Sequence, residues 1–84
     1  MTRKFRKKPV VIEAMQFTGS NLIEISDFCP LFKIEIFTDG PWYIITTLEG
    51  DHRSIPGDWI VKGIKGEFYP VKDEIFRETY EEIP

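Results

Sequence analysis

Cysteine is almost absent from this sequence, because Cys29 is the single example in 84 residues. One thiol forms no disulfide within the chain and supplies no cysteine cluster for a structural zinc site. Long apolar runs are also missing. The basic residues 1–8 are followed only by Pro9 and the apolar residues 10–12, a run too short for a membrane span or for the apolar part of a signal peptide. These absences favour a reducing, cytoplasmic setting without a membrane partner.

Recognised catalytic motifs are missing as well. The sequence holds no glycine-rich phosphate loop, HExxH pattern or GxSxG elbow. The only histidine is His52, and a small metal-dependent enzyme centred on it would draw on its charged neighbours Glu49, Asp51, Arg53 and Asp58. Turns between strands attract acidic residues anyway, so a solvated surface histidine is the preferred interpretation. We therefore predict no catalytic residue, no metal ligand and no cofactor.

The hypothesis that Cys29 and His52 form a nucleophilic pair has even less support than the metal-dependent site around His52. The position of Cys29 at the end of an expected helix is typical of a small core residue.

Apolar and aromatic residues are plentiful, at 42% and 14% of the chain. This content predicts a folded protein rather than a disordered one. A chain of this length has room for one core, so a single domain over residues 1–84 is predicted. Small domains have little surplus stability, and a homodimer is therefore an open possibility.

Periodicity predicts an α+β fold with one antiparallel sheet of five to six strands. A helix after the first strand can be capped by Ser20 or Asn21, with Asn21 and Glu24 at capping-box spacing. Its apolar residues Leu22, Ile25 and Phe28 or Cys29 share one face. A C-terminal amphipathic helix, capped by Asp73, is expected to pack on the sheet. The clearest hairpin surrounds the glycines of residues 63–66. At the turn of residues 56–58, Gly57 permits a positive φ and Asp58 is expected to accept backbone hydrogen bonds that hold the turn. The expected strands cover residues 10–17, 33–38, 42–48, 52–55, 59–62 and 67–71, with apolar positions of the last helix at Ile75, Phe76, Thr79, Tyr80 and Ile83.

Charge is distributed unevenly along the chain. Residues 1–8, which we call the basic arm, hold five basic residues and no acidic one, whereas residues 73–84 hold five acidic residues and one arginine. The simplest interpretation is that both ends are solvated and attract each other weakly, within or between subunits. The alternative is a flexible phosphate-binding arm. A net charge of −3 disfavours strong duplex binding, because such affinity grows with the number of phosphates neutralised.

Two ordered groups of residues carry a family resemblance. They cover about half of the chain and are more specific together than any one dipeptide. The C-terminal group runs from Pro56-Gly57-Asp58-Trp59-Ile60-Val61-Lys62-Gly63 through Gly66-Glu67-Phe68-Tyr69-Pro70 to Ile75-Phe76 and Thr79-Tyr80-Glu81, and the N-terminal group is Phe5-Arg6-Lys7-Lys8-Pro9-Val10 with Glu13-Ala14 and Gln16-Phe17.

The sequence resembles a group of small uncharacterised phage and prophage proteins through these residues. It is also similar to proteins with a Pro-Gly-Asp-Tyr-Gly signature, although Trp59 and Ile60 stand at the last two positions. Relatives often have cysteine and proline where this chain has Val71 and Asp73, so any chemistry of that cysteine is missing here. The resemblance implies a phage origin and no established activity.

Six residues are the candidate binding residues. Exposed aromatic rings beside lysines would suit nucleotides or single-stranded nucleic acid, whereas packing under the last helix is the alternative for the same rings. Glu67 is expected to pair with Lys62 or Lys65 across the hairpin. The set is Tyr43, Trp59, Lys62, Lys65, Glu67 and Tyr69.

The leading functional hypothesis is a non-enzymatic phage accessory protein that binds a host or phage macromolecule, most simply a protein. Interference with a host defence system is one form of it. A binder of nucleotides or single-stranded nucleic acid, using the basic arm and exposed aromatics, is the alternative. The enzyme centred on His52 is the third.

Overall fold

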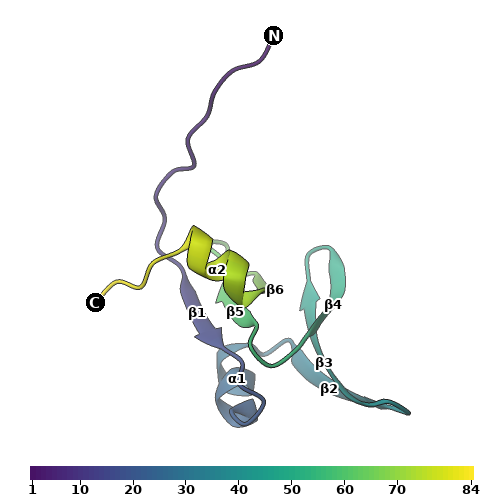
Figure 1. The fold of residues 1–84 in the computed structure, drawn as a ribbon. Coiled ribbons are helices and arrows are strands. Elements are labelled where there is room, and N and C mark those ends of the chain that lie inside the picture. The colour runs from purple at the N-terminus through teal and green to yellow at the C-terminus, as the bar shows by residue number, and fades with distance from the viewer.

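The computed structural model describes all 84 residues and contains two helices and six strands (Figure 1). The α+β class and the presence of a C-terminal helix are therefore confirmed. In chain order the elements are β1 (Glu13–Gln16), α1 (Leu22–Phe28), β2 (Phe32–Phe37), β3 (Gly40–Thr47), β4 (Gly50–Ser54), β5 (Trp59–Lys62), β6 (Phe68–Val71) and α2 (Asp73–Thr79).

The strands form two antiparallel sheets, and the prediction of a single sheet is wrong. One sheet has the order β1-β5-β6 and the other β2-β3-β4. The separation arises at the Pro56-Gly57-Asp58 turn, where Gly57 takes a φ of 102°, a backbone conformation that favours glycine. Beyond this turn the chain pairs with the first strand: Phe17 N–H donates to the Asp58 carbonyl at 2.8 Å, and Gly57 N–H donates to the Phe17 carbonyl at 2.7 Å.

The first strand is shorter than predicted because its partner is short. β1 pairs only with β5, from Glu13 opposite Lys62 to Gln16 opposite Trp59. After Lys62 the chain turns away into the hairpin loop, so residues 10–12 have no strand beside them. The predicted hairpin itself is confirmed, with β5 and β6 in antiparallel register. The strand predicted at residues 52–55 is present as β4, which begins two residues earlier and lies at the border of the second sheet.

The predicted helix caps are wrong in detail. Asn21 occupies the cap position of α1 but makes no side-chain cap bond; instead its Oδ1 accepts from the Thr18 N–H at 2.9 Å, and its Nδ2 donates to the Gln16 carbonyl at 2.8 Å. Asp73 is the first helical residue of α2 rather than its cap. Both side chains hold the preceding chain in place instead of the helix end.

The two sheets and α1 share one core. Phe17 lies at its centre, with ring centroids 5.7 Å from Phe32 and 4.8 Å from Tyr43 in edge-to-face contacts. The predicted inward face of α1 is confirmed, since Leu22 and Phe28 pack against the buried cluster that includes Ile25. The buried members are Phe17, Ile25, Cys29, Phe32, Ile45, Ile60 and Phe68.

Helix α2 covers the opposite face of the β1-β5-β6 sheet. The Phe76 ring stacks on Trp59 with centroids 4.3 Å apart and planes 8° from parallel. The predicted apolar face is only partly inward, because Ile75 and Ile83 are 55% and 57% exposed. The helix ends at Thr79, so Ile83 lies beyond it. The helix docks through Phe76 and Tyr80 rather than through a full stripe.

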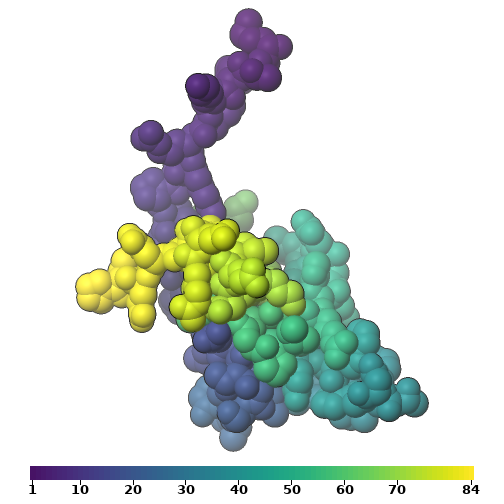
Figure 2. All heavy atoms as spheres, viewed as in Figure 1, coloured from purple at the N-terminus to yellow at the C-terminus, as the bar shows by residue number.

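Two segments project from this body. The radius of gyration is 14.5 Å, whereas a compact chain of this length is expected near 12 Å. Figures 1 and 2 show the cause: the residues preceding β1 extend away from the body without secondary structure, and the β2–β3 hairpin extends from the other side. Neither helix is long or apolar enough to cross a membrane.

Candidate functional site

The predicted aromatic binding residues are only partly exposed, and other aromatic rings cover Tyr43 and Trp59. Tyr43 packs against the core, parallel to Phe32 at a centroid distance of 6.0 Å. Trp59 lies between its sheet and α2, where Phe76 covers one face of the indole. The alternative of packing under the last helix therefore describes Trp59, and neither ring offers an open face beside the lysines.

The other four candidates lie around the β5–β6 hairpin. Lys62 and Lys65 are exposed, whereas Tyr69 is partly covered. Its burial and then a hydrogen bond with Tyr80 raise the pKa of Tyr69 to about 12. Tyr69 pairs with Val61 across the hairpin, so strand alternation directs the neighbouring Lys62 side chain to the other face of the sheet.

Glu67 does not pair with a lysine, and that prediction is wrong. The four ion pairs of the protein all lie elsewhere. The Glu67 side chain folds back over Gly63, where a Cβ would collide with its carboxylate. Its Oε2 is buried without a hydrogen-bond partner. The glycine at position 63 is what makes this inward position sterically open, a constraint that a strand-pairing rule does not anticipate.

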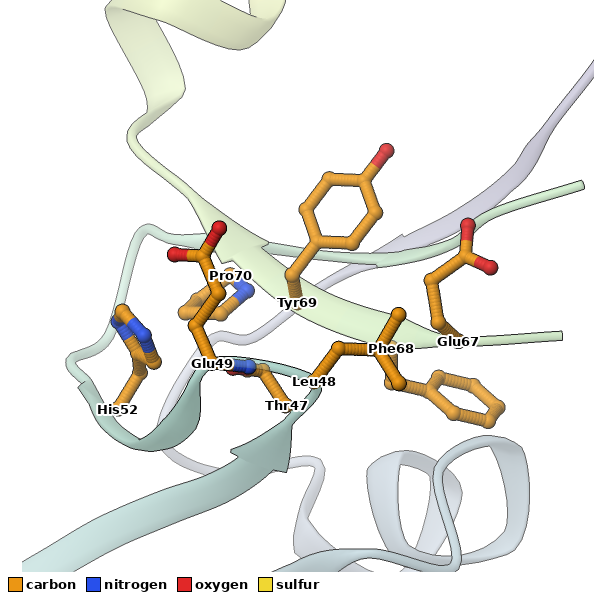
Figure 3. A pocket seen from close by; sticks show the side chains of 8 residues that line it. All are labelled: Thr47, Leu48, Glu49, His52, Glu67, Phe68, Tyr69 and Pro70. Atoms are coloured by element: carbon orange, nitrogen blue, oxygen red, sulfur yellow. The ribbon is translucent and has the colours of Figure 1, made fainter. Parts of the chain in front are cut away.

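A shallow hollow of about 310 Å³ lies between the β3–β4 turn and β6, as Figure 3 shows. His52 and Glu49 line one end, and Glu67 lies at the other. The Tyr69 side chain points away from the His52 end of the hollow. The imidazole of His52 makes no hydrogen bond, so no acid–base pair is formed there.

The charged cluster proposed around His52 does not form. Because neighbouring residues of a strand point to opposite faces, Asp51 and Arg53 lie across the sheet from His52. There Asp51 pairs with Lys33 at 3.3 Å, and the Arg53 guanidinium lies 4.0 Å from the centroid of the Trp42 ring. No three histidine, cysteine, aspartate or glutamate side chains are close enough to hold a metal ion.

Cys29 is a core residue. It is fully buried, and burial raises the pKa of its thiol. A thiol with a raised pKa is a poor nucleophile at neutral pH. The interpretation of Cys29 as a small core residue is therefore confirmed.

Asp58 is a buried structural acid. Its Oδ2 accepts from the Ile55 N–H at 3.0 Å and from the Ser54 hydroxyl at 3.5 Å, while Lys72 Nζ lies 3.3 Å from its Oδ1. The predicted role of Asp58 in holding its turn is confirmed. Lys72 adds a link from the turn to the start of α2 that the sequence interpretation missed.

Asp73 joins three elements through one oxygen. Its Oδ1 accepts from the Trp59 indole N–H at 2.8 Å, from Arg77 Nε at 2.8 Å and from Gln16 Nε2 at 3.4 Å. The Trp59 hydrogen bond and then Arg77 hold the pKa of Asp73 below its ordinary value of 3.8. The spacing of Asp73 and Arg77 was the one available signal, because residues four apart face each other on a helix.

The lowered pKa of Asp73 predicts how the stability of the protein changes at acidic pH. A depressed carboxyl pKa contributes stability above the ordinary value, near pH 3.8, and that contribution is lost as the pH falls through the lower folded-state value. Asp73→Asn removes this titration, so its stability should fall less than that of the original protein on acidification from pH 5 to pH 2. Urea unfolding across this range measures the difference. Glu74→Gln, a neighbouring exposed carboxylate on the same helix, is the control and should behave like the original; equal acid losses for Asp73→Asn would contradict the prediction.

The basic arm is the most accessible charged feature of the chain. Residues 1–11 are all exposed, and Phe5 is exposed at 83%. The expected attraction between the arm and the acidic C-terminal residues produces no ion pair. One cation–π contact links them instead, with Lys7 Nζ 5.4 Å from the Tyr80 ring centroid.

No protein-family model, curated protein or solved structure matches this chain.

Proposed function

We propose that this protein is a non-enzymatic interaction module of phage or prophage origin, which acts in the bacterial cytoplasm by binding a host or phage protein. The basic arm is the element that engages the partner. The observation that supports this most is the arm itself: eight residues with five cations and an exposed Phe5, projecting from a body that touches it through Lys7.

The composition of the arm suits an acidic protein surface with an apolar recess. Cations within reach of acidic groups steer association and set orientation, whereas a buried aromatic anchor supplies most of the affinity. Phe5 has that anchor chemistry, and Val10 and Val11 extend the apolar character along the same segment. An extended segment also has its backbone groups open for pairing with a sheet edge on the partner.

Nucleic acid fits the protein less well than an acidic protein does. The aromatic rings that would stack bases are turned inward at Tyr43 and covered by Phe76 at Trp59. Phe5 is the aromatic ring within the basic arm and is 83% exposed. The body behind the arm is acidic, since the net charge of the whole chain is −3 although the arm is basic. A long polyanion would be repelled by that body.

A capture experiment with matched variants tests the proposal. The immobilised protein is exposed to lysate from phage-infected host cells, and retained proteins are quantified by mass spectrometry. Neutralising the five arm cations to glutamine should remove at least one specifically retained acidic protein. Phe5→Ala should weaken that capture without altering the charge.

Lys62→Gln with Lys65→Gln is the charge control, because both lysines are exposed on the hairpin away from the arm. This double variant should retain the same partner. Identical capture by all variants would exclude the arm as the binding element. Arm-dependent, salt-sensitive binding of a 15-nucleotide oligo(dT) probe with no protein retained would favour the nucleic-acid alternative instead.

A further inference from the structure

Strand β2 is an open sheet edge with apolar residues on it. β3 pairs with one side of β2, and the only other substantial neighbour of β2 is α1. Ile34 is 45% exposed and Ile36 is 78% exposed. Open edges of this kind template pairing with another strand unless charge, proline or a bulge protects them. β2 has neither proline nor a bulge in its register with β3, and its two charged residues, Lys33 and Glu35, are of opposite sign.

The backbone of β2 presents free groups to this edge at alternate residues. The hairpin closes through the two-residue loop of Thr38 and Asp39, with Phe37 opposite Gly40. In such a hairpin the closing pair is hydrogen-bonded, and bonded pairs recur at every second residue. Ile34 and Ile36 therefore direct their N–H and C=O groups outward. Phe32 offers its carbonyl alone, because its N–H donates to the Cys29 carbonyl at 3.1 Å.

We propose that β2 pairs antiparallel with β2 of a second copy of this chain, about a two-fold axis that passes beside Ile34. The two β2-β3-β4 sheets then form one continuous six-stranded sheet. The arrangement is isologous, so it closes as a dimer and leaves no further copy to add at that edge.

The charges on one face of β2 favour this register over the two registers in which the axis is shifted by one residue. With Ile34 opposite Ile34, each Lys33 faces a Glu35 of the other copy, which gives two opposite-charge pairs. A shift of one residue at the axis in one direction sets Lys33 against Lys33. The shift in the other direction sets Glu35 against Glu35. Like charges directly opposite on neighbouring strands are destabilising.

The apolar face of β2 agrees with the same register. Ile36 of each copy lies opposite Phe32 of the other, and the two Ile34 side chains adjoin at the axis. The most exposed isoleucine of the strand thus extends the aromatic cluster of the other copy. A strand from an unrelated protein would not reproduce this self-matching of charge and apolar surface, which is why a second copy is the occupant.

Charge exchange tests the proposal directly. Sedimentation equilibrium of the original protein should show a monomer–dimer equilibrium. Glu35→Lys makes both facing positions positive and Lys33→Glu makes both negative, so each variant alone should dissociate, with the dimer dissociation constant raised by about tenfold or more. An equimolar mixture of the two variants restores both opposite-charge pairs and should form a heterodimer.

Two further measurements keep the result decisive. Thermal unfolding checks that each variant is folded, because Lys33 also pairs with Glu35 and with Asp51 within its own chain. If Lys33→Glu fails to fold, Glu35→Lys and Ile34→Lys carry the test, since both should weaken the dimer. A monomeric original protein, dimers that survive these changes, or folded variants that stay apart on mixing would overturn the proposal. Capture of a partner by the basic arm is a separate readout, because β2 and the arm are distinct surfaces.

Discussion

Phe17→Ala should lower the free energy of unfolding by about 3–5 kcal/mol, the usual cost of emptying a buried aromatic site. Phe17 is fully buried and contacts both Phe32 and Tyr43 of the β2-β3-β4 sheet. Its own backbone bonds to the turn that starts β5. The side chain therefore joins the two sheets within one buried cluster.

Urea or guanidinium unfolding followed by circular dichroism measures this effect. Natural domains are stable by on the order of 5–15 kcal/mol in total, and small ones lie at the low end. Phe17→Ala should therefore leave a substantial unfolded fraction without denaturant. Phe17→Leu keeps most of the volume and should cost less than half as much. Val11→Ala, at a residue 74% exposed, is the control; a loss below about 1 kcal/mol for Phe17→Ala would contradict the central position of this ring.

Asp58→Ala should lower the free energy of unfolding by about 2–3 kcal/mol, the second large effect, because it removes the hydrogen-bond acceptor of a buried turn. Asp58 is 3% exposed. Without its carboxylate, the Ile55 N–H and the Ser54 hydroxyl lose their partner, and Ser54 is itself fully buried. Unpaired buried donors cost more than the hydrogen bonds themselves contribute.

Two companion variants separate the hydrogen bonds of Asp58 from its charge. Asp58→Asn keeps an acceptor oxygen for Ile55 and should cost less than the alanine change. Lys72→Met removes the ammonium group, which is largely in solvent because 58% of the Lys72 side chain is exposed, so its effect should be about 1 kcal/mol or less. Equal losses for the alanine and asparagine changes, measured by the same unfolding experiment, would show that charge rather than turn bonding dominates.

Local features of this fold could be predicted from the sequence. The turn at Gly57 and Asp58, the inward face of α1 and the β5–β6 hairpin each depend on residues close together in the chain. Glycine at a positive φ, an aspartate that accepts nearby backbone N–H groups, and apolar residues at helical spacing act at short range. Their structural meaning is therefore readable without knowledge of the rest of the molecule.

Long-range pairing could not be predicted in the same way. Whether β5 joins β4 or β1 depends on the bonds between Phe17 and the turn at residues 57–58, which lie about half the chain apart. How far the candidate aromatic rings are covered also depends on residues that are distant in the chain. Trp59 is covered only because α2 places Phe76 over it. Tyr43 is covered because Phe17 and Phe32, from earlier parts of the chain, pack against its ring. The His52 cluster failed for a simpler reason, since strand alternation separates it from Asp51 and Arg53.

The tryptophans of the chain are divided between the two sheets. Trp42 belongs to β3, beneath the Arg53 guanidinium, and Trp59 belongs to β5, beneath Phe76. These are the only two indoles in the sequence. Substituting either one with phenylalanine leaves a single fluorophore that reports on one half of the molecule. Comparing the melting curves of the two resulting proteins would establish whether the halves unfold as one cooperative unit or in sequence.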